Sequence, residues 1–194
     1  ERYGVYAPIW GWMYDDSVER CDRGVGVVDV STLTQPRVEP EIVFCLADDL
    51  PPGVDAPDLA ARLEWVAFGF EVVQCHYPEW KVTAVDSVID GSLHGVSRIG
   101  RQVAPWRTMV GDLERFTLQL LRNGSVIDTG RGSNVLGSPL NALAHLAASS
   151  SVPLHAGEII TTGTITDAAW VRAGEEYTVQ LDGVPLEPLT VRFV

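Results

Sequence analysis

Two glutamates stand two positions apart at the start of a run of strand-forming apolar residues. They are Glu39 and Glu41, in the stretch VEPEIVF at 38–44. Side chains alternate faces along a strand, so both carboxylates point the same way. Like charges this close repel, and the free-energy cost of keeping each carboxylate ionised is higher where the site is partly buried. The pair therefore either lies on a solvated face or holds a positive group between its carboxylates.

A third glutamate, Glu71, heads another apolar run, FEVVQCHY at 70–77, much as Glu41 heads the first. Three carboxylates at the heads of neighbouring buried strands would repel strongly without a cation. All-oxygen ligation suits Mg²⁺ or Mn²⁺, with water or substrate in the other positions. The alternative is a solvated pair with Glu71 unrelated to it, because E-x-E alone is a weak pattern.

The elements that must position these side chains can be read from periodicity and turn residues. Residues 38–46 are continuously apolar after Glu41, which predicts a strand covered on both faces. In DLAARLEWVAFGF, at 58–70, apolar residues recur at helical spacing, so we predict a helix that ends at Gly69. A second strand follows at 70–77. The helix would bring the two strands side by side.

The rest of the chain is mostly strands and glycine-centred turns. Asn123-Gly124, between two alternating runs, predicts a tight hairpin. A helix is expected from Pro139, with Ser138 as its N-terminal cap. Short strands and loops are expected over 1–30, and strands alternate with turns after 156. The pattern indicates one domain with many strands and two clear helices.

The composition is that of an ordinary globular domain, and it is acidic. The 194 residues include 14 Lys and Arg against 26 Asp and Glu, a net charge of -12. This argues against nucleic acid or an anionic membrane as partner. It does not exclude a small anionic substrate, because a bound cation can reverse the sign locally. Three scattered cysteines favour a reducing, cytoplasmic setting, and no apolar run is long enough for a membrane helix.

Four segments carry a resemblance to a known superfamily. They are VEPEIVFCLADDL, FEVVQCHYPEW, LLRNGSVIDTGRGSNVLGSPLNALAHLA and PLHAGEIITTGTITDAAWVRAGEEYTVQLDGV. Together they resemble the fumarylacetoacetate hydrolase superfamily, in its branch of 2-keto-4-pentenoate hydratases and 4-oxalocrotonate decarboxylases. The resemblance runs in order from about Tyr3 to the C-terminus. It implies an α+β, mainly β fold, a mixed roll or sandwich with flanking helices.

The resemblance also implies a site. In that family an E-x-E pair and a third acidic residue hold one Mg²⁺ or Mn²⁺, and the matching positions are Glu39, Glu41 and Glu71. The family's C-terminal strand-turn matches 156–164, which makes Thr162, Gly163 and Thr164 candidates for contacts to a substrate carboxylate. Hydroxyls and free backbone N–H groups at a glycine turn suit an anionic oxygen.

The activity implied is that of a metal-dependent hydratase acting on a 2-hydroxy-dienoate or 2-oxo acid, as in the catabolism of aromatic ring-cleavage products. A 2-oxo acid can chelate such an ion through its carboxylate and 2-oxo oxygens. Water then adds at the far end of the conjugated chain. A C–C hydrolase or decarboxylase of the same superfamily, or a member that binds an oxo acid without turnover, are the alternatives. We expect a homo-oligomer, and a single catalytic domain over 1–194 whose N-terminal segment is missing.

Three stretches depart from the family's pattern. Where hydratases carry I-[VI]-D-S-R after the third ligand, this chain has VVQCH at 72–76, and Ile9 replaces an aspartate. Of D-N-A-S, only Asp90 is retained. His76, His94 and Asp90 are therefore candidates for catalysis. Each also has a purely structural alternative: His76 could be hydrogen-bonded at a strand end, His94 could be solvated in a loop, and Asp90 could be a turn residue.

Aromatic residues near the N-terminus, Tyr6, Trp10, Trp12 and Tyr14, could line an apolar pocket for the substrate tail or simply belong to the core. Cys45 and Cys75 are expected to be inert core thiols.

Overall fold

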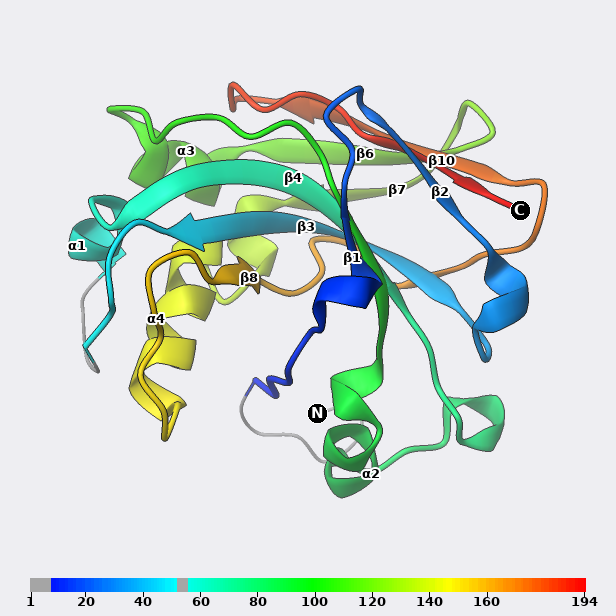
Figure 1. Cartoon of the computed structure of the whole chain (residues 1–194). Helices are drawn as coiled ribbons and strands as arrows, with labels where there is room; N and C mark the ends of the chain where they lie inside the picture. Colours follow the sequence, from blue (N-terminus) through cyan, green and yellow to red (C-terminus); the bar gives the residue numbers. More distant parts are fainter. Residues whose placement is uncertain (1–7, 52–55) are drawn as a thin grey trace.

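Two β-sheets share one hydrophobic core in the computed structural model, which describes residues 8–51 and 56–194 (Figure 1). The first sheet, ordered β1-β5-β4-β3-β8 with β9 also beside β3, contains β1 (Val18–Arg20), β3 (Arg37–Leu46), β4 (Leu63–Val73), β5 (His94–Ile99), β8 (Ile159–Thr161) and β9 (Ala169–Trp170). The second, ordered β2-β11-β10-β6-β7, contains β2 (Val25–Val28), β6 (Thr117–Arg122), β7 (Ser125–Arg131), β10 (Glu176–Asp182) and β11 (Thr190–Phe193). The expected mixed α+β, mainly β architecture is confirmed.

The antiparallel pair β3 and β4 forms the middle of the first sheet. Alternation gives β3 two different faces. Ile42, Phe44 and Leu46 point into the core shared with the second sheet. Val43 and Cys45 point the other way, into a smaller cluster with Trp65 of β4. Because both faces are covered, the strand is continuously apolar, as its sequence predicted.

The predicted helix over 58–69 is wrong. The helix α1 covers only Ala56–Ala60, and β4 already begins at Leu63. The helical spacing of Leu59, Leu63 and Val66 arose by chance across a short helix and a strand. From Leu63 onward the chain is rich in aromatic and β-branched residues that are buried on both faces, which favours a strand.

This correction changes how the glutamates meet. Since β3 and β4 run in opposite directions, Glu39 and Glu41 lie near the start of β3 while Glu71 lies near the end of β4. The sequence interpretation had placed all three at the heads of neighbouring strands. The three residues still come together, because an antiparallel ladder brings the start of one strand beside the end of the next.

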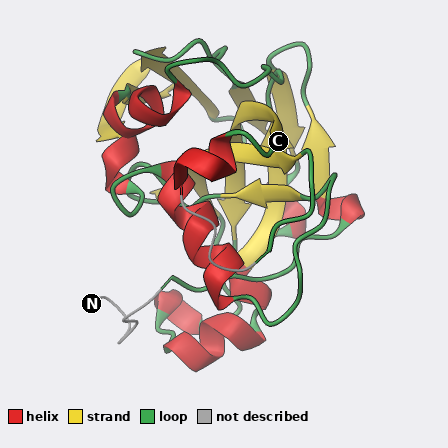
Figure 2. Cartoon of the chain, turned by 90° about the vertical axis from the view of Figure 1, so that its left-hand side faces the viewer, coloured by secondary structure: helices red, strands yellow, loops and turns green. Residues whose placement is uncertain are grey.

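The helices gather at the ends and on one side of the sheets (Figure 2). The expected helix α4 covers Pro139–Ser149 and buries Leu140, Leu143 and Ala147. Ser138 precedes it as predicted, but its hydroxyl makes no capping bond. Two short helices, α2 (Ala84–Ile89) and α3 (Met109–Arg115), were not predicted from sequence. The hairpin β6–β7 turns at Asn123 and Gly124 as expected.

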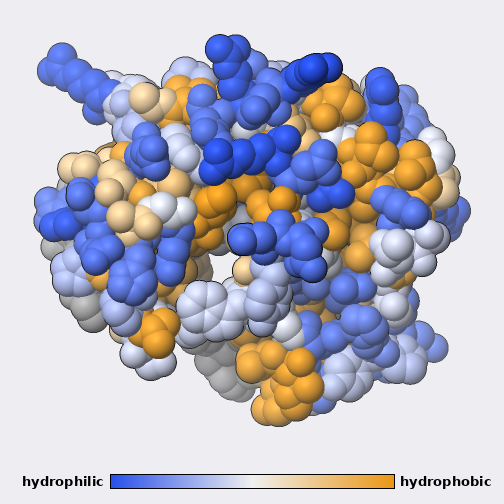
Figure 3. All heavy atoms as spheres, in the orientation of Figure 1, coloured by the Kyte–Doolittle hydropathy of each residue, from blue (hydrophilic) through white to orange (hydrophobic). Residues whose placement is uncertain are grey.

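The surface is mixed in character. Apolar side chains gather over α2, where Val85, Val88 and Ile89 are exposed, and the same face is hollowed near its middle (Figure 3). Among the helices of the described residues, none combines the length and apolarity needed to cross a membrane.

The first prediction concerns the core that supports β3. Phe44 is fully buried, so Phe44→Ala should lower the free energy of unfolding by roughly 3–5 kcal/mol. Val126 on β7 is half exposed, and Val126→Ala should change the free energy of unfolding by less than about 0.5 kcal/mol. Urea denaturation followed by circular dichroism measures both. Equal unfolding midpoints for the two variants would contradict this account of the core.

Candidate metal centre and its cavity

The register of β3 and β4 brings the three glutamates together. Glu39 stands directly opposite Glu71, and Glu41 stands opposite Gly69. Each glutamate offers one carboxylate oxygen, and these three atoms lie within 4.8 Å of one another. Two of the residues come from one strand face and the third from its neighbour, so the pairing of β3 with β4 brings the three side chains together.

Gly69 permits this register. A Cβ added there would lie 2.7 Å from Cγ2 of Val43, closer than real side chains approach. The glycine therefore allows β4 to lie against β3 beside the glutamates while Val43 stays packed in its small cluster. Sequence periodicity predicts that this glycine ends a helix, whereas in the structure it lies inside β4.

Glu41 is the most deeply placed of the three, with 1% of its surface exposed. Its Oε2 accepts a hydrogen bond of 2.9 Å from the backbone N–H of Gly163. Its Oε1 is buried and has no hydrogen-bond partner among the described residues. A buried carboxylate oxygen without a partner is costly, and in native proteins it calls for a missing proton, water or ion.

The electrostatics of the cluster favour uptake of positive charge. Burial and the neighbouring Glu71 carboxylate raise the pKa of Glu39 to about 8. Burial, Glu71 and Glu39 raise the pKa of Glu41 well above its usual range. The Arg37 guanidinium, which lies against the rings of both Trp80 and Trp170, partly opposes the rise in the pKa of Glu39. An all-oxygen cluster of this kind fits a hard divalent cation.

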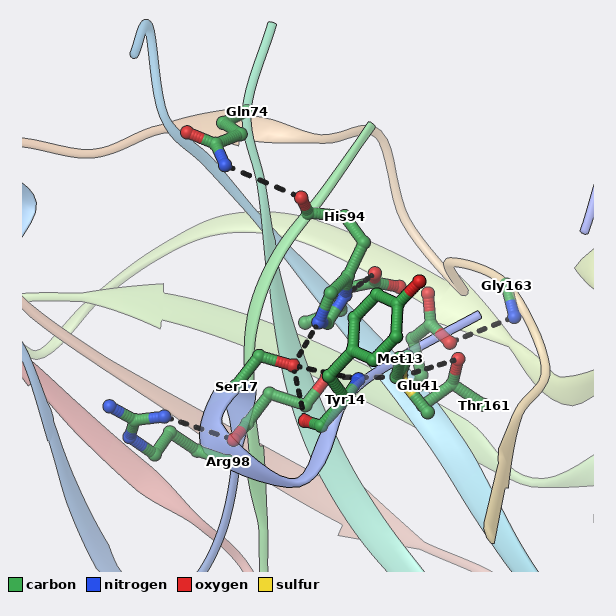
Figure 4. A network of polar contacts seen from close by, with 11 residues as sticks. Met13, Tyr14, Ser17, Glu41, Gln74, His94, Arg98, Thr161 and Gly163 are labelled. Atoms are coloured by element: carbon green, nitrogen blue, oxygen red, sulfur yellow. Dashed lines mark hydrogen bonds and ion pairs between the residues drawn. The ribbon is translucent and has the colours of Figure 1, made fainter. Parts of the chain in front are cut away.

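His94 contacts the third glutamate. Its Nδ1 lies 2.6 Å from Oε1 of Glu71, and its Nε2 lies 2.8 Å from the hydroxyl of Ser17 (Figure 4). That hydroxyl lies 2.7 Å from the carbonyl oxygen of Tyr14. Of the three candidates for catalysis, His94 is therefore the one that the structure brings to the glutamates. His94 lies 23 residues after Glu71, so no local sequence pattern could indicate this contact.

The other two candidates pair with each other. Nδ1 of His76 lies 2.6 Å from Oδ1 of Asp90, and the backbone N–H of His76 donates to Oδ2. Neither residue lines the cavity described below. The pair ties the end of β4 to the turn before β5 and so anchors that turn. A part for either residue in catalysis stays a prediction.

The three residues predicted to contact a substrate carboxylate lie beside Glu41. The hydroxyls of Thr162 and Thr164 donate to the carbonyl oxygens of Ile42 and Thr166. The Gly163 N–H, expected to be free, donates to Glu41 instead. With φ at +95°, Gly163 adopts a conformation that favours glycine. The turn therefore supports a glutamate directly, and its place beside a substrate remains a prediction.

The glutamates open into a cavity of about 1190 Å³. Thr162, Gly163 and Thr164 line it, as do the expected aromatics Trp10, Trp12 and Tyr14. Tyr6 lies outside the described residues. Cys45 and Cys75 are buried, as expected of core thiols.

Part of the cavity wall comes from α4, which sequence reasoning did not place there. Ala142, His145 and Leu146 line it together. They stand at i, i+3 and i+4, the spacing of one helical face, and that spacing could have identified His145 as a residue of the site.

Comparison with known proteins gives three consistent findings. The family described as Fumarylacetoacetate (FAA) hydrolase C-terminal matches residues 19–192. A 2-hydroxyhexa-2,4-dienoate hydratase from Comamonas testosteroni is 35% identical over 95% of this chain and 70% of its own length. A 4-oxalocrotonate decarboxylase from Pseudomonas putida is 34% identical over all of this chain and 72% of its own length.

A solved structure agrees with these relatives. That of 4-oxalocrotonate decarboxylase from Pseudomonas putida G7, complexed with magnesium and adipate, matches 100% of this chain and 72% of its own chain. The TM-score is 0.88 at 30% sequence identity. The hydratases and decarboxylases are thus similarly close to this chain.

The second prediction follows from the raised pKa of Glu39. Unfolding returns the pKa of this carboxyl from about 8 to 4.5, so between these pH values the folded protein binds more protons than the unfolded chain. In chelator, the free energy of unfolding should therefore fall as pH rises from 5.5 to about 8. Glu39→Gln should make this dependence less steep, and Glu114→Gln, on the exposed side of α3, should leave it as it is in the wild type.

Urea denaturation at several pH values provides the measurement. The pKa of Glu41 is also raised, so Glu41 contributes to the fall over the same window and part of the slope should persist in Glu39→Gln. The remaining shifted carboxyls and thiols titrate outside the window, because their pKa values are lowered from 3.8 or raised to about 11: Asp29, Asp49, Asp86, Asp112, Cys21 and Cys45. A Glu39→Gln protein with the wild-type slope would show that Glu39 does not carry the shift.

Proposed function

This chain belongs to the fumarylacetoacetate hydrolase family, in its branch of hydratases and decarboxylases, and on that premise we propose that it is a divalent-metal-dependent hydratase. Its substrate would be a small 2-hydroxy-dienoate or 2-oxo acid of the kind that arises in the breakdown of aromatic rings. The hydratase relative from Comamonas testosteroni supports this choice.

One observation carries the proposal: the buried, partnerless Oε1 of Glu41 within a cluster of three carboxylates that opens into a cavity. Glu39, Glu41 and Glu71 would hold Mg²⁺ or Mn²⁺. When bound, such an ion would supply a Lewis acid for the carboxylate and 2-oxo oxygens of the substrate. The magnesium in the solved decarboxylase complex is consistent with this choice of ion.

The chain's own groups would preorganise that centre. The Gly163 N–H orients one oxygen of Glu41 and leaves the other toward the cluster. His94 holds one oxygen of Glu71 in the same way. Fixed donors of this kind need no reorganisation when charge changes nearby. Thr162, Gly163 and Thr164 would form the wall beside the substrate carboxylate, and Trp10, Trp12 and Tyr14 would cover its apolar tail.

The 2-hydroxy-dienoate must first ketonise, so that its hydroxyl loses a proton and the fifth carbon gains one. Hydration then joins the oxygen of water to the fourth carbon of the resulting 2-oxo-3-enoic acid and a proton to the third. The group that serves the fourth and fifth carbons must lie within hydrogen-bond reach of the far end of the substrate. Among the described residues that line the cavity, His94 and His145 are the histidines. His94 is bonded at both ring nitrogens, so we favour His145, which lines the cavity from α4, for contact with the far end.

Decarboxylation of a 4-oxalocrotonate-type acid is the second candidate function. The observation that favours it is the solved decarboxylase, whose structure covers the whole of this chain at a TM-score of 0.88. The same three glutamates would serve it, because both reactions begin from a chelated 2-oxo acid. C–C hydrolysis of an acylpyruvate is a third use of the same geometry.

The third prediction tests the metal centre. Mg²⁺ at about a hundred times its dissociation constant should stabilise the wild-type protein by roughly 2.7 kcal/mol, a rise of about 5–10 °C in Tm. Glu41→Gln removes the deepest carboxylate charge and should abolish that rise. Glu114→Gln is the matched control and should respond as the wild type does. Thermal unfolding with Mg²⁺ or chelator measures all three, and a Glu41→Gln protein with the full rise would contradict the assignment.

The fourth prediction separates the reactions. The purified protein is incubated with 2-hydroxypenta-2,4-dienoate, 4-oxalocrotonate or an acylpyruvate, with Mn²⁺ or chelator. We expect Mn²⁺-dependent loss of the dienoate with formation of the 4-hydroxy-2-oxo acid, detected by absorbance and mass spectrometry. Release of CO₂ from oxalocrotonate alone would favour the decarboxylase, and cleavage of the acylpyruvate alone would favour the hydrolase. Metal binding without any turnover would indicate a binding protein.

A further inference from the structure

We propose that His94 is a positioning residue of the metal centre, which holds Glu71 in the orientation that the ion needs. The inference rests on the proposed function, since it concerns the same three glutamates. It adds a fourth side chain to them, one that would contact the ligand glutamate without contacting the ion.

The contact between His94 and Glu71 is short and shielded. Nδ1 of His94 lies 2.6 Å from Oε1 of Glu71, and the two side chains are only 10% and 13% exposed. In the tautomer that carries its hydrogen on Nδ1, the ring donates this bond to the carboxylate oxygen. A charge-assisted bond with little competing water is among the stronger kinds of hydrogen bond. One oxygen of Glu71 is thereby fixed, and the other is left for the centre.

A separate anchor fixes the imidazole from its far side. Nε2 lies 2.8 Å from the Ser17 hydroxyl. That hydroxyl is itself held within the turn Asp15–Ser17, where it contacts both the carbonyl oxygen and the N–H of Tyr14, at 2.7 and 3.3 Å. Figure 4 shows the ring of His94 beside Ser17. The ring cannot rotate without breaking a contact at each nitrogen, so it holds the Glu71 carboxylate in one orientation.

The cluster gives Glu71 a reason to need such a partner. Its carboxylate faces Glu39 directly across the ladder and lies near Glu41, and both repel it. In the absence of a donor on its outer side, the lowest-energy rotamer of Glu71 would turn away from its neighbours. The hydrogen bond from His94 opposes that rotation. Partners of this kind commonly govern the affinity of a metal site without contacting the ion.

His94 is assigned a positioning role and not a catalytic one because both ring nitrogens are engaged within the protein. Position 94 is also where the chain leaves the turn 91–93 and enters β5, and that turn is anchored by the pair of His76 and Asp90. The backbone as well as the ring is thus fixed at this position.

The fifth prediction uses three variants and one control. His94→Phe keeps a ring but removes both contacts, and it should weaken Mn²⁺ binding by roughly 10–100-fold. His94→Asn places an amide N–H near the position of Nδ1 and should recover most of the lost affinity. Ser17→Ala removes the outer anchor and should lose less than His94→Phe. His155→Phe makes the same change at a 59% exposed histidine and should bind as the wild type does.

Free Mn²⁺ measured by electron paramagnetic resonance gives the dissociation constants, and the line shape of the bound ion reports the symmetry of its ligands. Both are readouts that a general loss of stability does not move in this graded order. Circular dichroism in chelator establishes that each variant is folded. Should His94→Phe not fold, the order of His94→Asn and Ser17→Ala relative to the wild type still decides the matter.

Two results would overturn the inference, and they are distinguishable. If the wild type binds Mn²⁺, Glu41→Gln does not, and the His94 and Ser17 variants bind with wild-type affinity, then the metal centre stands and His94 has no part in it. If the wild type itself binds no Mn²⁺, the proposed metal centre fails and the positioning role fails with it.

Discussion

The pairing of β3 with β4 forces three carboxylates to share one small volume, and much of the surrounding structure can be understood as a response to their repulsion. The ladder that brings Glu39 opposite Glu71 continues over both strands and is supported on its other face by the core around Phe44. Hydrophobic burial on one face of a strand thus holds together charges on the other. A solvated loop with the same residues would let them separate.

The responses to that repulsion are of three kinds. Part of it is met by protons, since the pKa values of Glu39 and Glu41 are raised. Part is met by donors, the backbone of Gly163 and the ring of His94. What remains is the unpaired oxygen of Glu41, which no described residue satisfies. A divalent cation would neutralise the repulsion among the three carboxylates and give the unpaired oxygen of Glu41 a partner. It would also allow an acidic protein to bind an anionic acid at this site.

Much of this could be predicted from sequence, and the failures have physical reasons. Period-two alternation correctly placed Glu39 and Glu41 on one face, and the family resemblance identified Glu71 as their companion. The helix expected over 58–69 failed because apolar residues buried on both faces of a strand can match helical spacing by chance. That error also inverted the direction of β4, although pairing at the level of Glu39 and Glu71 does not depend on direction.

Contacts between distant residues account for the rest. The bond from His94 to Glu71 depends on the register of β5 against β4, and the contact of Ser17 depends on a turn 77 residues away from His94. Neither leaves a local pattern. The N–H of Gly163 was expected to face a substrate, but it donates to Glu41. Which backbone N–H groups are free can be told only once the fold is known.

The two supports of the centre differ in how they can change over evolution. Gly163 supports Glu41 with its backbone N–H, which every residue except proline retains, and the turn tolerates few residues at a φ of +95°. His94 supports Glu71 with a side chain that a single codon change can replace. The first support is inherited with the fold, while the second is open to variation. Divergence among such proteins in metal preference or affinity is therefore more accessible through position 94 than through position 163.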